Sequence, residues 1–117
     1  MANASWNPFM VTFSLTDTNV HALTDLLSAL STKPTFATLP SGVMRAAGIV
    51  IVNDVGNGGA KLYIGNSNVS TTVYGKCLVA SQEWSPGSYE SNLITLNNIY
   101  LKADTNPTVV AVTILTR

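Results

Sequence analysis

The sequence predicts a mainly β fold, a single antiparallel β-sandwich with one short helix near the N-terminus. Three observations lead to this prediction. The chain has 117 residues, which is enough for one hydrophobic core and too few for two domains. Hydrophobic residues make up 46% of it and charged residues only 10%, so the chain is globular and not disordered. Short β-branched runs follow one another between turn clusters, without the alternation of strands and helices that builds a parallel sheet.

The N-terminal part contains a leader, the first strand and the only predicted helix. Residues 1–8 form a polar leader that ends at Pro8, and residues 9–117 form the domain. Phe9–Leu15 alternates as a strand does, with its odd-numbered residues on one face. Thr16–Asn19 offers good N-cap residues, and leucines spaced three and four apart follow it. This pattern predicts an amphipathic helix over about Thr18–Ser31, ended by Pro34.

The remainder of the chain is predicted to be strands and turns. Further strands are expected over Arg45–Asp54, Ala60–Gly65, Val73–Ser81, Glu83–Glu90, Leu93–Leu96, Ile99–Ala103 and Thr108–Leu115. The first two of these are interpreted as a hairpin, because the glycine-rich segment Val55–Gly59 between them suits a tight turn.

Charge and cysteine content argue against several classes of function. Six basic and six acidic residues cancel, and no run of Lys or Arg exists to attract a phosphate backbone, so no nucleic-acid partner is expected. The longest apolar run, around Ala46–Val52, is too short to span a membrane. Cys77 is the only cysteine, which excludes an intrachain disulfide, and its flanks predict a small buried side chain in a strand.

No constellation typical of catalysis or of a cofactor is found. His21 is the only histidine, and nothing in the sequence ties it to Cys77 or to a particular serine. One histidine and six scattered acidic residues give no metal-ligand cluster, and Asp54 is interpreted as a turn-former. The glycines before Lys61 do not form a phosphate loop, because a strand follows where such a loop needs Ser or Thr and a helix. The chain is therefore predicted to be no enzyme and to hold neither cofactor nor metal.

Binding functions are better supported by the residues. The loop Asn66–Thr72 carries many neutral donors and acceptors, which suit either a carbohydrate or a wet protein interface. The six Trp and Tyr residues are expected in the core, with a sugar-stacking platform as the alternative. Trp6 in the leader either docks onto a neighbouring molecule or caps its own sandwich.

The second part of the chain, about Ala46–Thr116, contains a series of short motifs in a fixed order: Leu62-Tyr-Ile-Gly65, Asn66-Ser-Asn-Val-Ser-Thr71, Tyr74-Gly-Lys-Cys-Leu78, Trp84-Ser-Pro-Gly87 and Asn98-Ile-Tyr-Leu101. With these motifs in this order, the segment resembles small β-structured virion proteins of tailed bacteriophages. The chain departs from the pattern by the insertion Ser81–Trp84 before the Pro-Gly turn.

This resemblance implies a jelly-roll-like sandwich that decorates or cements a capsid. The implied partners are the major capsid protein and further copies of the chain in a homotrimer, and the implied location is the virion surface after synthesis in the bacterial cytoplasm. Low charge agrees with such a subunit, because a covered surface needs little charge to stay soluble. The residues expected at partner contacts are Trp6, Pro8, Phe9, Asn66, Asn68 and Thr71. The alternative is a tail or fibre module that binds a host glycan through its loops.

Overall fold

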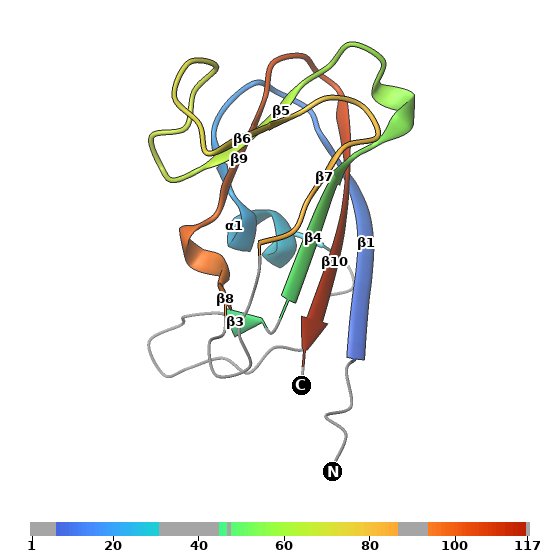
Figure 1. Cartoon of the computed structure of the whole chain (residues 1–117), viewed down its shortest axis with the longest axis vertical. Helices are drawn as coiled ribbons and strands as arrows, with labels where there is room; N and C mark the ends of the chain where they lie inside the picture. Colours follow the sequence, from blue (N-terminus) through green and yellow to red (C-terminus); the bar gives the residue numbers. More distant parts are fainter. Residues whose placement is uncertain (1–6, 31–44, 47, 87–93, 117) are drawn as a thin grey trace.

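The computed structural model describes residues 7–30, 45–46, 48–86 and 94–116 (Figure 1). These residues form ten strands, one α-helix and two short 3₁₀ helices. The strands are β1 (Asn7–Leu15), β2 (His21–Ala22), β3 (Arg45–Ala46), β4 (Gly48–Asn53), β5 (Leu62–Gly65), β6 (Lys76–Leu78), β7 (Glu83–Trp84), β8 (Ile94–Thr95), β9 (Tyr100–Ala103) and β10 (Thr108–Thr116). The helices are α1 (Leu23–Ser28), η1 (Val55–Asn57) and η2 (Leu96–Asn98). The fold is mainly β, as the sequence predicts.

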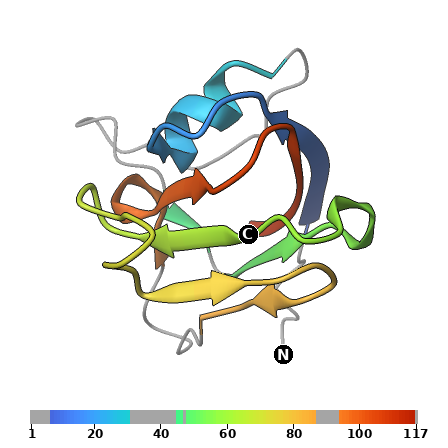
Figure 2. The ribbon, with the colours of Figure 1, turned by 90° about the horizontal axis from the view of Figure 1, so that it is seen from above.

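Two antiparallel four-stranded sheets and one small pair make up the architecture. The first, called sheet I here, has the order β1-β10-β4-β7, and the second, sheet II, has the order β2-β9-β5-β6. The remaining strands, β3 and β8, pair only with each other. Figure 1 shows sheet I running along the molecule and sheet II crossing its upper end, and Figure 2 shows β9, β5 and β6 side by side.

The two sheets have matching strand orders, because a direct link in the chain joins each strand of sheet I to the strand in the same position of sheet II. The links are short: residues 16–20 join β1 to β2, 54–61 join β4 to β5, 79–82 join β6 to β7, and 104–107 join β9 to β10. The fold is thus four long strand segments, each bent at a corner. Corners of this kind are how orthogonally packed sheets share strands.

The core lies between the two sheets and follows from strand alternation. On β1, Phe9, Val11, Phe13 and Leu15 share the inner face as predicted, and Leu15 is 1% exposed. Leu15 belongs to one cluster with Val112 of sheet I and with Leu62 and Leu101 of sheet II. Every second residue of a strand points to the same face, so the β-branched run of β10 sends Val110, Val112 and Ile114 inward.

The predicted helix over Thr18–Ser31 is wrong in its bounds. α1 has six residues, and the two residues before it form β2, which pairs with Leu101 and Tyr100 of β9. The N-cap of α1 is Ala22, whose side chain makes no hydrogen bond, so the predicted N-cap residues Thr16–Asn19 do not cap this helix. The spacing of the leucines did indicate a helix with one buried face, since Leu23 and Leu27 of α1 are buried. The start of the predicted helix instead pairs with β9 and forms an edge strand of sheet II. This pairing gives hydrogen-bond partners to backbone groups that would have none at a free helix end.

The predicted hairpin between Arg45–Asp54 and Ala60–Gly65 is also wrong. β4 pairs with β10 and β7, whereas β5 pairs with β6 and β9, so the two strands belong to different sheets. The glycine-rich segment between them forms η1 and a further turn in which Gly58 has φ 63°. This positive φ explains the glycine there. The segment turns a corner between sheets and does not close a hairpin.

The other predicted strands exist with shorter or shifted bounds. The run Arg45–Asp54 is divided between β3 and β4, and the run Leu93–Leu96 gives β8 followed by η2. The expected strand Glu83–Glu90 gives β7, and its residues 87–90 lie outside the described part of the chain. β1 begins at Asn7, two residues earlier than expected, so Pro8 belongs to a strand and not to the leader.

Candidate functional site: the loop between β5 and β6

The segment Asn66–Gly75 joins β5 to β6 at the upper left of Figure 1 and contains no charged residue. The sequence places a strand from Val73 onward, but β6 begins only at Lys76. Val73, Tyr74 and Gly75 therefore belong to the loop, which is longer and more apolar than predicted. We call this segment the β5–β6 loop. It brings together three of the residues expected at partner contacts: Asn66, Asn68 and Thr71.

Local hydrogen bonds hold the β5–β6 loop in one shape. In its first half, the amides of Val69 and Asn68 donate to the main-chain and side-chain oxygens of Asn66, each at 2.9 Å. In its second half, the Ser70 amide donates to the Val73 carbonyl at 2.7 Å, and the Ser70 hydroxyl accepts from the Val73 amide at 2.9 Å. Asparagine and serine side chains replace backbone partners in this way in tight turns. The polar residues of the loop thus shape it as well as coat it.

Two side chains anchor the loop to sheet II. Val69 is 3% exposed and packs beneath the loop, so closely that a Cβ at Gly65 would lie 3.2 Å from it. The Tyr74 ring sits 5.1 Å from the Tyr63 ring at an interplanar angle of 56°, a tilted arrangement that aromatic pairs favour. Tyr63 is largely covered, and burial is the main cause that raises its pKa above the ordinary value. These two side chains hold the loop against sheet II.

The exposed side of the loop carries both polar and apolar side chains and no charged one. Val73 is 61% exposed and Tyr74 is 48% exposed, although both are large apolar residues. Asn66, Asn68 and Thr71 are exposed beside them. Sequence reasoning missed Val73 and Tyr74 because their pattern continued into the strand. The signal that could have separated them is Gly75, since a glycine in a strand run often marks its end or a bend.

Two hollows flank the base of the loop and share Gly65 and Gly75. One, of about 280 Å³, is lined by loop residues that include Val69 and Tyr74. The other, of about 240 Å³, is also lined by Lys76, Trp84 and Asn98. Each is large enough for a small group such as one sugar ring or one side chain of a partner.

The remaining expected contact residues lie elsewhere. Trp6 falls outside the described residues. Pro8 and Phe9 lie at the start of β1, at the opposite end of the molecule from the β5–β6 loop (Figure 1). Phe9 pairs with Ile114 and shares the core side of sheet I with it, half-buried. The structure therefore brings together the loop residues and separates them from the β1 residues.

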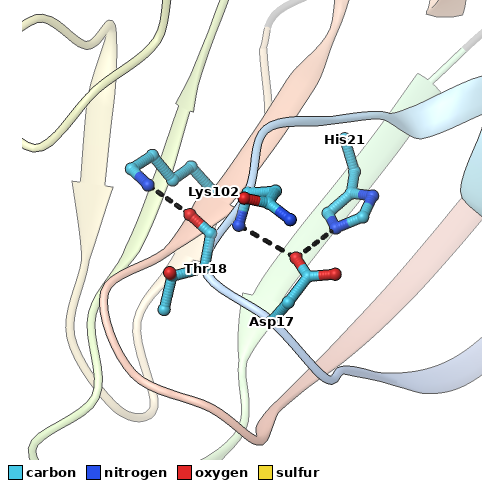
Figure 3. A network of polar contacts seen from close by, with 5 residues as sticks. Asp17, Thr18, His21 and Lys102 are labelled. Atoms are coloured by element: carbon cyan, nitrogen blue, oxygen red, sulfur yellow. Dashed lines mark hydrogen bonds and ion pairs between the residues drawn. The ribbon is translucent and has the colours of Figure 1, made fainter.

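The two side chains considered for catalysis lie far apart in the fold. His21 is on β2 and Cys77 on β6, which are the opposite edges of sheet II. His21 was expected on the helix but lies on the strand β2. Its Nε2 contacts a carboxylate oxygen of Asp17 at 2.7 Å (Figure 3). That hydrogen bond, followed by one from the Asn19 amide, holds the pKa of Asp17 below its ordinary value. Cys77 is half-buried, less than predicted.

Other polar groups at this end of the molecule serve the fold. The ammonium of Lys102 donates to the Thr18 carbonyl, which ties the β1–β2 link to β9 (Figure 3). Asp54 is a turn-former as predicted, because its carboxylate accepts from the Gly56 amide at 2.9 Å and caps η1. Within the described part of the chain, no group of three or more His, Cys, Asp or Glu residues is placed to hold a metal ion.

A buried polar network at the corner between the sheets was not predicted. Asn53 is 0% exposed, and its amide nitrogen donates to the carbonyls of Ala60 at 2.9 Å and Leu78 at 2.8 Å. Its side-chain oxygen accepts from Asn57, which also exchanges two hydrogen bonds with the backbone of Val109. The network joins β4, β6 and β10 where the chain turns from one sheet to the other. It explains why an asparagine ends an otherwise apolar strand.

Comparisons with known proteins give no relative for this chain: no family model, no curated protein and no solved structure matches it. Among the helices that the structure describes, none has the length and apolar character to cross a membrane.

Proposed function

We propose that this protein is a non-enzymatic structural subunit of a tailed-phage virion, a decoration protein that binds the outer surface of the major capsid protein shell as a homotrimer and stabilises the head. The observation that carries the proposal is the β5–β6 loop, an uncharged projection with a fixed shape and two exposed apolar side chains. The motif order shared with small virion proteins of tailed phages supports the same assignment.

The physical argument concerns what such a loop gains and loses on binding. Hydrogen bonds within the loop already fix its backbone, so little conformational entropy is lost when a partner covers it. Tyr74 and Val73 supply apolar area, and tyrosine is among the residues enriched at interfaces. Asn66 and Asn68 can keep their hydrogen bonds through bridging water, and no charge has to be desolvated.

A small loop gives only a weak contact, which is why the proposal includes a homotrimer. Three copies joined together present three loops to a repeating surface, and binding of the first loop raises the effective concentration of the others. A capsid is such a repeating surface. Linked weak contacts then act as one strong contact without any new chemistry at each loop.

The test compares two valine variants for binding to heads that lack the protein. Val73 and Val55 are 61% and 73% exposed, but Val73 is on the β5–β6 loop and Val55 is on η1. We expect Val73→Asp to lower co-sedimentation with heads by at least ~tenfold, because a buried unpaired charge is costly at an interface. Val55→Asp should bind as the unchanged protein does. Absence of head binding by the unchanged protein, or equal loss in both variants, would contradict the proposal.

A glycan-binding tail or fibre module is the second candidate, and one observation favours it. The hollow of about 240 Å³ beside the loop places Trp84 near Asn98 and Lys76. An aromatic side chain with amide and ammonium donors is a combination that can bind a sugar ring. Asn98 is exposed, so Asn98→Ala should leave the fold intact. Low-micromolar binding to a glycan array that this variant loses would favour the module over the decoration protein.

A further inference from the structure

The outer face of sheet I is unusual for a sheet side turned away from the core. Antiparallel sheets commonly carry polar residues on their solvent side. Here two neighbouring rows cross the three adjacent strands β1, β10 and β4, as the strand register shows. The rows are Thr12, Ala111 and Val52, and Met10, Thr113 and Val50.

These residues are accessible and none is charged. Met10 is 74% exposed, Thr12 is exposed, and the outward residues of β10 and β4 are half-buried. No Lys, Arg, Asp or Glu occurs in β1, β4 or β10, so the face is uncharged across these three strands and meets its first charge at Glu83 of the edge strand β7. Among the elements that the structure describes, sheet II and α1 lie on the inner side of sheet I and do not cover this face (Figure 2). We call it the outer face of sheet I.

The opposite sheet shows that low overall charge does not produce such a face by itself. Tyr63 pairs with Lys102 on the outer side of sheet II, and the Lys102 ammonium is bonded to Thr18. The exposed face of sheet II thus carries a cation on its central strand β9, whereas β1, β10 and β4 carry only methionine, valine, alanine and threonine in the two outward rows. The first charged residue beside the outer face is Glu83 on β7, which pairs with Val52 at its border.

We infer that the outer face of sheet I is the surface through which copies of this chain associate with one another. A symmetry axis brings each residue close to its own copies, so a charge there would meet a like charge. A face without charge avoids this repulsion. A charged partner would find nothing on it to complement, while each further copy offers the same uncharged strands, and the three copies of a trimer can all turn this face toward their common axis.

The size of the face sets the strength of the association. β1 and β10 have nine residues each and β4 has six, so strands about 4.8 Å apart with a rise of about 3.3 Å per residue cover roughly 400 Å². This is about half of what one partner contributes to a standard stable interface, although it is within the range of functional patches on monomers. Association through this face is therefore weak in dilute solution and strengthened where copies are held together. The oligomer is the one named in the proposed function, on which this inference rests for its biological role alone.

The test uses a matched pair of threonine variants in the full chain. Thr12 lies on the outer face in the edge strand β1, and Thr105 is exposed in the link between β9 and β10, so Thr12→Lys and Thr105→Lys make the same chemical change at two sites. Sedimentation velocity from micromolar to roughly millimolar protein should show reversible oligomers for the unchanged chain. Thr12→Lys should weaken this association by at least ~tenfold. Thr105→Lys should stay within about twofold, since exposed substitutions away from a contact have small effects.

A charge-reversal mixture separates a true contact from a general effect on folding. Thr12→Lys and Thr12→Glu should each be impaired alone and should associate when mixed, because opposite charges then meet across the contact. Both variants should melt close to the unchanged protein. A chain that remains monomeric at the highest concentration, or oligomers that Thr12→Lys leaves intact, would overturn the inference. Neither result depends on head binding, so failure of the inference and failure of the proposed function give different outcomes.

Discussion

Removing the Asn53 side chain should destabilise the protein more than any other single asparagine change considered for this chain. Asn53→Ala deletes the donor of two hydrogen bonds, to the carbonyls of Ala60 and Leu78, and the acceptor of a third from Asn57. A buried group left without its partner costs about 1–3 kcal/mol. Two orphaned carbonyls therefore cost about 2–6 kcal/mol, from a total stability on the order of 5–15 kcal/mol.

The assay is urea unfolding followed by circular dichroism, together with thermal melting. Since about 1 kcal/mol shifts the melting temperature of a domain of this size by roughly 4 °C, we expect a fall of at least ~8 °C. Asn68→Ala is the matched control, because Asn68 is exposed on the β5–β6 loop. Its free energy of unfolding should change by no more than about 0.5 kcal/mol.

Coupling between the two asparagines gives a sharper check. Asn57→Ala alone removes contacts to Val109 and to Asn53, so the double variant loses the shared hydrogen bond only once. The free energy of unfolding lost in the double variant should be about 0.5–3 kcal/mol smaller than the sum of the two single losses, which is the range for residues in one network. Additive losses, or an Asn53→Ala protein that melts within ~2 °C of the unchanged protein, would refute the reasoning that the corner depends on this network.

Three further predictions follow from local geometry. Gly65→Ala should destabilise by about 1–3 kcal/mol in urea unfolding, because its Cβ would lie 3.2 Å from the valine beneath the loop; Gly59→Ala, with nothing within 4 Å, is the control and should change little. In His21→Ala, the pKa of Asp17 read by NMR should rise toward its ordinary value, because the histidine is the main cause of its depression. The stability that this carboxylate contributes is present above its ordinary pKa and is lost on acidification through the lowered pKa, and an unchanged Asp17 titration in the variant would exclude the mechanism. Deletion of Met1–Trp6, which leaves β1 whole, should keep the melting temperature and abolish head binding if the leader docks on a neighbour; a much lower melting temperature would assign Trp6 to the core of its own chain.

The parts of the fold that sequence could predict are those fixed by alternation along one segment. The odd-numbered residues of β1 allow only one buried face, and the structure turns that face inward. The β-branched run of β10 is a strand, as expected. The parts that failed depend on pairing between distant segments. β4 and β5 are close in sequence and suggested a hairpin, but their partners β10 and β9 come from the end of the chain. Loop composition alone does not distinguish a hairpin turn from a corner.

The candidate site was predictable in its position and not in its extent. A polar run bounded by glycines located the loop, whose residues Asn66, Asn68 and Thr71 are exposed as expected. The exposure of Val73 and Tyr74 could not be predicted, since it depends on where β6 begins to pair with β5. The uncharged outward rows of β1, β10 and β4 could not be predicted either, because they depend on the register that places outward residues of three separate strands side by side.

Electron cryomicroscopy of the virion that carries this protein would locate it on the head or in the tail. We expect trimeric density on the outer surface of the head, with the β5–β6 loops toward the major capsid protein and the outer faces of sheet I, on which Met10 is 74% exposed, turned toward one another. Density for this fold confined to the tail or fibres, or subunits on the head that touch the shell through the outer face of sheet I, would contradict it.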